Sequence, residues 1–523
     1  MSAFTSPNLA EKDIRVVVGI DFGTTFSGFA LANKANPGII ETHETWPDRK
    51  GHLKTNTALQ YDEKWNVIRW GAPALASRPK RKKNSAAVVE TKPVELFKLH
   101  LGEMEHSKKP PLPTGLDYRK AITDYLRQMS KLVKDTLKIR WPGLEFDRHV
   151  LKVMTVPAEY DEKARFTLRT CAYEAGLIDT MNSEHLEFTP EPEAAAIYCI
   201  KVLKEHSLEK ESSFLIVDCG GGTVDLTVRI LKENNKLTEV TERTGDFCGG
   251  SYVDKEFLKY LEKQIGSSAM RTLEEKHYAQ LQYLVQEFCA IAKFEFNGNN
   301  NFGVKEIDLE EVCPVLKQYV TGDMRDNMEE QEWMIQLDHG TIKGFFDPVV
   351  EKIITLIENQ LSAAKNKVSA MFMVGGFSES KYLFKRVKQK FDTRVPIIAI
   401  PSDPIAAVVR GAVLYGMNMA TIETRVLKRT YGLRLATRWK HGDPIERKTE
   451  TGRIKYFKRI VKRGTEVPVD ASFFQGVHPS YPEQTEMDFH IYTTPSDDGK
   501  YCDDDEMDHF GSMTIVSRLG PVR

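Results

Sequence analysis

The chain has 523 residues, a length typical of about three or four domain-sized units with hydrophobic cores of their own. Lysine and arginine number 73 against 74 aspartates and glutamates, so the net charge of −1 argues against general attraction to nucleic acid or anionic membranes. The seven cysteines include no C-x-x-C pair, which fits reduced thiols, and the first residues show no secretory signal. We therefore expect a cytoplasmic protein with no nucleic-acid or membrane partner.

Near the N-terminus, the sequence predicts a β-hairpin with a glycine-containing turn. An apolar run over residues 16–20 meets the polar turn 21–25, and apolar alternation resumes over residues 26–31. A second unit of the same kind spans residues 214–230, around the turn 218–223. Both turns begin with aspartate and read D-x-G-[GT]-[GT]. This repetition indicates an internal duplication, with a cleft between two similar lobes.

Strands and helices alternate through both predicted lobes, which indicates an α/β fold. The apolar periodicity predicts strands at 151–156 and 371–374, and helices at 161–175, 192–205, 252–265, 273–294 and 346–367. After about residue 419 the pattern changes to short strands between glycine, proline and aspartate turns, at 430–436, 456–461, 487–492 and 512–516.

These patterns predict three domains. A first lobe spans residues 1–185, a second lobe spans 186–420, and a short β-rich domain spans 421–523, with truncation of that last domain left open. A basic run over residues 78–83 is typical of a solvated loop, and a nuclear-import signal is the alternative.

The two glycine turns suit phosphate binding. Because glycine lacks a Cβ atom, backbone N–H groups can come close to phosphate oxygens. Threonine hydroxyls add donors, and a carboxylate at the mouth of such a turn can hold Mg²⁺ through its water ligands. One such turn alone is more often structural. The repeat favours two hairpins that clamp a polyphosphate from both sides.

Several segments resemble, in the same order, those of the DnaK-type heat shock protein 70 family. They cover about residues 14 to 417 and are residues 19–27, 153–158, 190–196, 216–225, 245–250, 373–378 and 403–416. The resemblance implies duplicated actin-like (ribonuclease H-like) lobes around a nucleotide cleft, ATP or ADP with Mg²⁺ as cofactors, and slow ATP hydrolysis.

The resemblance also implies roles for single residues. Metal positions are Asp21, Glu191, Asp218 and Asp225, and catalytic positions are Lys98, Glu191, Asp218 and Thr223. Nucleotide-binding positions are Gly23, Thr24, Thr25, Gly220, Gly221, Gly222, Thr223, Gly249, Gly250, Lys293, Gly375, Gly376, Ser378 and Asp403. Lys92 competes with Lys98 for its role. A solvated lysine and a helix-start carboxylate are the ordinary alternatives for Lys98 and Glu191.

The sequence departs from the family at the expected adenine pocket. Ala290, Phe294 and Glu379 stand where the family has a glutamate and two arginines. Phe294 offers a ring face for stacking on the base. We therefore expect weak discrimination between ATP and GTP.

The C-terminal part resembles the start of the family's β-sandwich substrate domain, most clearly over residues 457–468. The family's apolar acidic linker is replaced by the basic stretch 425–429, which we expect not to dock into the same lobe groove and to couple weakly to nucleotide. This combination is similar to an atypical, lid-poor branch of the family.

Three functions remain open from the sequence. The first is an ATPase that couples Mg-ATP binding and hydrolysis to protein clients, with signalling partners or co-chaperones as further partners. The second is a nucleotide-sensing interaction scaffold with little turnover. The third is a small-metabolite kinase of the same fold, against which the β-rich tail argues.

Overall fold

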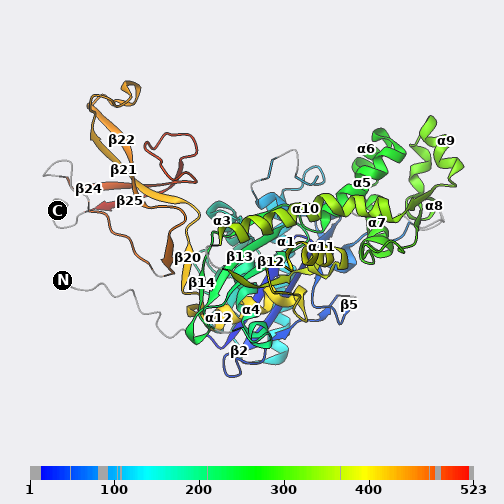
Figure 1. Ribbon diagram of the computed structural model, residues 1–523, viewed down its shortest axis with the longest axis horizontal. Helices are drawn as coiled ribbons and strands as arrows, with labels where there is room; N and C mark the ends of the chain where they lie inside the picture. Colours follow the sequence, from blue (N-terminus) through cyan, green and yellow to red (C-terminus); the bar gives the residue numbers. More distant parts are fainter. Residues whose placement is uncertain are drawn as a thin grey trace. The chain divides into compact units, whose positions relative to one another are not determined.

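The computed structural model describes residues 13–47, 49–79, 92–102, 104–105, 109–208, 210–364, 367–469, 471–476 and 484–516 (Figure 1). The chain forms two compact units. One contains Met1–Val228 and Thr244–Thr421, and the other contains Arg229–Arg243 and Ile422–Arg523. The second unit thus takes in a short segment from the middle of the sequence. Of the basic run 78–83, residues 80–83 lie outside the described residues.

The described residues form two six-stranded sheets, and the first sheet, in the first unit, is built on the N-terminal hairpin. Its strand order is β11-β10-β1-β2-β3, with β6 also paired to β2. The strands are β1 (Val16–Phe22), β2 (Phe26–Asn33), β3 (Glu41–Thr42), β6 (Thr55–Asn56), β10 (Val150–Val156) and β11 (Leu186–Pro190). β1 runs antiparallel to β2 and parallel to β10. Every residue of β1 and β10 is buried, as expected for central strands covered on both faces.

Helices cover this sheet. Residues of α1 (Tyr118–Arg140) and α3 (Glu162–Glu174) form one hydrophobic core with β1 and β10. α4 (Glu191–Glu205) and α12 (Ala407–Met417) lie next to each other (Figure 1). Their approach depends on Gly411, because a Cβ atom there would lie 1.8 Å from the carbonyl oxygen of Ala194. Likewise, a Cβ atom at Gly19 of β1 would lie 2.5 Å from the carbonyl oxygen of Val409 in α12.

The second sheet has the strand order β14-β13-β12-β18-β19, with β15 also paired to β13. Its strands are β12 (Ser213–Cys219), β13 (Val224–Leu231), β14 (Leu237–Glu239), β15 (Thr244–Asp246), β18 (Val368–Val374) and β19 (Ile397–Ala399). β12 is parallel to β18, and β18 is parallel to β19. The strands predicted around both glycine turns are therefore present.

Two helix predictions differ from the structure. The single helix predicted over 273–294 is α6 (Ser267–Lys276), α7 (Tyr278–Phe288) and a π-helical turn, Cys289–Lys293. The break falls at His277, whose φ of −132° is not helical and whose ring nitrogen lies 3.0 Å from the Tyr319 hydroxyl. The helix predicted over 346–367 begins earlier, as α10 (His339–Ala363), because Asp338 caps it by accepting from the Thr341 amide.

The second unit is rich in β-strands. A four-stranded sheet has the order β22-β21-β24-β25, and a separate pair joins β20 to β23. The strands are β20 (Thr424–Val426), β21 (Thr430–Arg438), β22 (Arg453–Val461), β23 (Glu466–Pro468), β24 (Glu486–Thr494) and β25 (Asp508–Val516). All four strands predicted after residue 419 are therefore present.

The backbone around the basic stretch is hydrogen-bonded to side chains of β13 and β14. The amide of Val426 donates to Glu239 Oε2 at 2.7 Å, and Arg229 donates to the carbonyl oxygen of Thr424 at 3.5 Å. Arg229 and Glu239 lie on β13 and β14 and are fully buried. These contacts use backbone atoms of residues 424 and 426, so the positive side chains of the basic stretch do not prevent them.

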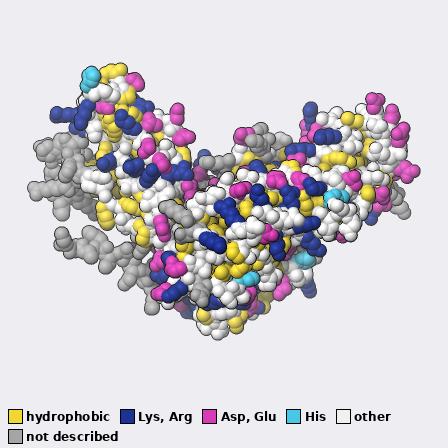
Figure 2. All heavy atoms as spheres, viewed as in Figure 1, with side chains coloured by type: hydrophobic (Ala, Val, Ile, Leu, Met, Phe, Trp, Pro, Cys, Tyr) yellow, Lys and Arg dark blue, Asp and Glu magenta, His cyan; other side chains and the backbone are white. Residues whose placement is uncertain are grey.

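The remaining elements lie in the first unit. They are β4 (Thr45–Trp46), β5 (Arg49–Lys50), β7 (Ala58–Tyr61), β8 (Val67–Trp70), β9 (Lys92–Glu95), α2 (Phe146–His149), α5 (Ser251–Ile265), β16 (Lys305–Asp308), α8 (Leu309–Val312), α9 (Asp323–Glu330), β17 (Met334–Leu337) and α11 (Lys381–Phe391). Cationic and anionic side chains are interspersed on the face seen in Figure 2. Among the described helices, none has the length and apolar character needed to span a bilayer.

Candidate functional site

The two glycine turns touch each other in the first unit. A Cβ atom at Gly221 would lie 1.9 Å from the Thr25 hydroxyl oxygen, and one at Gly222 would lie 2.6 Å from the Thr24 hydroxyl oxygen. Only glycine allows so close an approach. The first turn follows β1 and the second follows β12, so the ends of the two central strands face each other through these turns.

Two further glycine segments predicted from the sequence pack against the second turn. The amides of Gly249 and Gly250 donate to the carbonyl oxygens of Gly222 and Gly220, at 3.1 and 3.0 Å. Gly375 has φ of 81°, and a Cβ atom there would lie 2.4 Å from Asp218 Oδ1. The amides of Gly249 and Gly250 are thus occupied by backbone carbonyls and hold the turn in place.

Four carboxylates line the meeting point of the turns. Asp21 is the penultimate residue of β1, Glu191 begins α4, Asp218 lies in β12 and Asp225 lies in β13. All four are buried, with between 0% and 8% of their surface exposed. Burying so much negative charge together is unfavourable unless cations are present.

The pKa values of Glu191, Asp218 and Asp225 reflect that crowding. Burial raises the pKa of Asp218 well above its usual value, and the charges of Glu191 and Asp225 raise it further. Burial also raises the pKa of Glu191, although the Lys98 ammonium opposes this. The pKa of Asp225 rises to about 7, through burial and then the charge of Glu191. A cation placed among these groups would favour their ionised forms.

Two buried lysines meet the carboxylates. Lys98 Nζ lies 2.9 Å from Glu191 Oε1, and Lys54 Nζ lies 2.5 Å from Asp21 Oδ2. Lys98 lies in a short 3₁₀ helix, Phe97–Leu101, and its carbonyl oxygen accepts a hydrogen bond from the Tyr160 hydroxyl. Lys92, its competitor, begins β9, and its side chain is outside what the structure describes.

Lys54 was missed by the sequence analysis. It lies in a polar segment before β6, without a motif or an amphipathic pattern around it. Only the pairing of β6 with β2 brings this segment beside the first turn. In the sequence, the only hint that Lys54 belongs to the site is that the polar residues Thr55 and Thr57 follow it closely.

The carboxylate cluster suits a hydrated Mg²⁺ ion better than a directly bound one. One oxygen of Asp225 accepts from the Ala158 amide at 2.8 Å, while its other oxygen is buried with no hydrogen-bond partner in the structure. Within the described ranges, no group of three or more acidic, histidine or cysteine side chains is arranged to bind a metal directly. Mg²⁺ usually keeps several waters, so the residues fit a hydrated ion held through its waters.

The expected adenine-side residues are engaged with protein partners. Lys293 Nζ lies 2.6 Å from Asp254 Oδ1 and is buried. The Ser378 hydroxyl donates to the carbonyl oxygen of Val374 at 2.5 Å, and Asp403 pairs with Arg410 at 2.6 Å. Phe294 is 68% exposed, so its ring is open to solvent.

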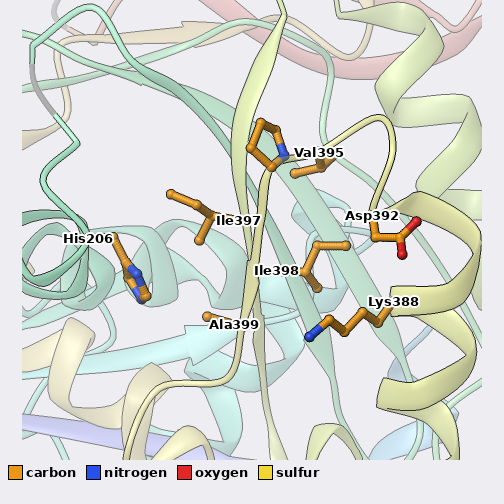
Figure 3. Close-up of a pocket in the computed structure, with 8 residues that line it drawn as sticks. His206, Lys388, Asp392, Val395, Ile397, Ile398 and Ala399 are labelled. Carbon is orange, nitrogen blue, oxygen red and sulfur yellow. The ribbon is translucent and has the colours of Figure 1, made fainter.

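Two cavities lie outside this cluster. One of about 250 Å³ lies beside the edge strand β19 and is lined by His206, Lys388, Asp392 and residues 395–399 (Figure 3). The other, of about 510 Å³, is lined by Arg69, Ala72, Pro73, Leu75, Ala76, Ser77 and Gln286. Neither includes a residue that the sequence analysis proposed for the site.

Much of the chain is similar in sequence to known proteins. Residues 146–467, more than half of the sequence, match the model of the family described as Hsp70 protein. Human "Heat shock 70 kDa protein 12A" is 25% identical, over 98% of this chain and 86% of its own length. Human "Heat shock 70 kDa protein 12B" is 24% identical, over 97% and 84%. The "Chaperone protein HscA homolog" of Acinetobacter baylyi is 24% identical, over 76% of this chain and 57% of its own length.

Proposed function

Because the chain belongs to the Hsp70 protein family, as a divergent member, we propose that it is an Hsp70-like ATPase that couples Mg-ATP binding and hydrolysis to the binding of protein clients. Members of this family bind nucleotide, typically with Mg²⁺, and have an actin-like ATPase fold. The observation that carries the proposal is the contact between the glycine turns at Gly221 and Thr25, beside four buried carboxylates and two lysines.

The proposed domains are a first ATPase lobe over residues 1–185, a second over 186–420 and a β-rich domain over 421–523. The duplication is supported by the two six-stranded sheets. In both sheets the hairpin strands and their parallel neighbours have the same spatial order. The orders are β11-β10-β1-β2-β3 and β19-β18-β12-β13-β14. The third domain is supported by the strand-rich segment 422–523.

We assign the cluster its roles as follows. Asp21, Asp218 and Asp225 hold the waters of the magnesium ion, and Glu191 orients the water that attacks the terminal phosphate. Bound Mg²⁺ supplies neutralisation of phosphate charge. The backbone of residues 23–25 and 220–223 surrounds the phosphates, and the Thr223 side chain opposes the rise in the pKa of Asp225 that burial causes. Lys98 stabilises the negative charge that develops during phosphoryl transfer.

Single-turnover ATP hydrolysis with Mg²⁺ tests this function. We expect the wild-type protein to bind ATP by calorimetry and to hydrolyse it, and Asp218→Ala to lower the hydrolysis rate about 10²–10³-fold. Asp124→Ala is the matched control, because Asp124 is equally buried but pairs with Tyr61 and Lys120. It should retain hydrolysis. Absence of binding heat at millimolar ATP would refute the proposal.

A nucleotide-sensing scaffold with little turnover is the second candidate. It is favoured by the adenine side, where Lys293 is held by Asp254 and the residues Ala290 and Glu379 replace polar contacts of the family. The two candidates differ in one measurement. A scaffold binds ATP but shows the same hydrolysis rate in wild type and Asp218→Ala.

Client binding needs its own test. The name of the relative "Chaperone protein HscA homolog" supports a chaperone role for this chain, with clients or signalling partners bound through residues after 421. Pull-down with the full chain, followed by affinity measurements in ATP and in ADP, tests coupling. Equal affinities in both nucleotides would favour the scaffold.

A further inference from the structure

Lys54 forms the closest ion pair of the carboxylate cluster. Its Nζ lies 2.5 Å from Asp21 Oδ2, and only 9% of the lysine side chain is exposed. The other oxygen of Asp21 lies 3.3 Å from the Thr155 hydroxyl, which donates to it. Both oxygens of the carboxylate therefore have partners within the protein.

The charge of Lys54 reaches beyond Asp21. It lowers the pKa values of Glu191 and Asp218, which burial raises, so one ammonium acts on three of the four carboxylates. Lys98 neutralises Glu191 from the other side. Four carboxylates and two ammonium groups leave a formal charge of −2 when all are ionised, which one divalent cation would neutralise.

An ammonium and a hydrated magnesium ion are alternative partners for the same carboxylate. Both are compact cations that interact with carboxylate oxygens through N–H or O–H donors. Because Asp21 is buried and its Oδ2 already accepts from Lys54, a water of the ion that binds this oxygen would compete with the ammonium. A magnesium ion held by Asp21 therefore has to weaken the pair with Lys54.

We propose that Lys54 is a built-in counter-ion of Asp21 that stabilises the nucleotide-free cluster, competes with Mg²⁺ and so sets the magnesium concentration at which nucleotide binds. This inference rests on the proposed nucleotide binding. It assigns to Lys54 a positioning role through Asp21, and its consequences appear in metal dependence and in stability without metal.

Lys54→Met tests the proposal by removing the ammonium while keeping much of the side-chain volume. Without metal, in EDTA, the variant should melt several degrees below wild type, because Asp21 loses its cation, and Mg²⁺ should recover much of that loss. In ADP binding by calorimetry at fixed ADP, the magnesium concentration at half-saturation should fall about tenfold. Wild type should show little stabilisation by Mg²⁺ alone.

Lys152→Met is the matched control. Lys152 is fully buried on β10 of the same sheet, donates to the carbonyl oxygen of Phe146 at 3.1 Å and lies 3.9 Å from Asp147. Its removal should lower the melting temperature equally with and without Mg²⁺. The magnesium midpoint for ADP should stay at the wild-type value.

Lys54→Arg gives a change in the opposite direction and covers the case in which Lys54→Met does not fold. A guanidinium pairs with carboxylates through two parallel hydrogen bonds, so it should compete better and raise the magnesium midpoint above wild type. An unchanged or lower midpoint in Lys54→Arg, or an unchanged midpoint in a folded Lys54→Met, overturns the inference while nucleotide binding stands. Failure of wild type to bind ADP at any magnesium concentration overturns both.

Discussion

At the scale of single residues, the candidate site is a balance between buried acids and buried lysines. Asp218 and Asp225 have raised pKa values because they are buried beside each other and beside Glu191. Lys98 and Lys54 offset part of that charge. Burying such groups lowers the stability of the protein when no ligand is bound, and functional sites often contain destabilising groups of this kind.

The first residue-scale prediction concerns Lys98. Lys98→Ala should lower single-turnover hydrolysis about 10²–10³-fold, because the ammonium acts on charge that develops in the transition state, while ATP binding changes less. Lys120→Ala serves as control, since Lys120 also pairs with a carboxylate, at 2.7 Å, but is 44% exposed. Hydrolysis at the wild-type rate in Lys98→Ala would show that Lys98 is structural only.

The second residue-scale prediction uses the pKa of Asp225, which is about 7 in the folded protein. In the unfolded chain the carboxyl ionises near its usual value, so between about pH 4 and pH 7 the folded state binds the extra proton. Stability is therefore lost as pH rises through this window, and the loss is complete above about pH 7.

Asp225→Asn should remove this loss, because an amide oxygen can still accept from the Ala158 amide at 2.8 Å while the charge is gone. Without nucleotide and in EDTA, its melting temperature should exceed that of wild type more at pH 8 than at pH 5. A constant difference across this range would contradict the prediction. Nucleotide binding with Mg²⁺ should weaken in the same variant.

At the scale of elements, glycines decide how closely helices and turns approach. α4 and α12 meet at Gly411, where a Cβ atom would lie 1.8 Å from a backbone oxygen of Ala194. A backbone obstacle cannot rotate away as a side chain can. The helices must separate to accept any larger residue, which disturbs Glu191 at the start of α4.

The element-scale prediction compares two glycine-to-alanine changes inside helices. Gly411→Ala should destabilise the protein by about 1–3 kcal/mol through overpacking. Gly344→Ala in α10 should stabilise it by about 0.5–1 kcal/mol, because its Cβ atom would meet no atom within 4 Å and alanine is the better helix former. Thermal melting checks both signs. Equal effects of the two changes would show that α4 and α12 can separate at little cost.

At the scale of the whole molecule, the second unit is organised around a buried ion pair. Arg229 and Glu239 lie 3.0 Å apart with no exposed surface, and Glu239 also accepts from the amide of Val426. A carboxylate that serves both an arginine and a backbone amide links the β13–β14 hairpin to the stretch that begins the C-terminal segment.

The molecule-scale prediction is that Glu239→Gln destabilises the chain by about 3–5 kcal/mol, because it leaves the buried charge of Arg229 without an anionic partner at that position. The control is Glu242→Gln, which breaks the partly exposed pair with Arg463 at 2.8 Å and should cost about 0–1 kcal/mol. Melting temperatures of the two variants measure the difference. Similar values for both would mean that the buried pair contributes little.

Much of the secondary structure and part of the site followed from the sequence alone. Alternating apolar runs around residues 16–31 and 214–230 determine hairpins because side-chain direction alternates locally along a strand. The strands of the C-terminal part followed from the same rule and from turn residues. The D-x-G repeat indicated two turns that come close together, since glycine's freedom of approach is a property of the residue itself.

The tertiary structure alone decided the contacts between segments distant in sequence. Lys54 reaches Asp21 because β6 pairs with β2, and Val426 reaches Glu239 because β20 lies along the β13–β14 hairpin. The break between α6 and α7 at His277 also involves a partner that is distant in sequence, Tyr319. Local patterns report which face of a strand or helix is apolar, but pairing between segments depends on burial and hydrogen bonding that exist only once the chain is folded.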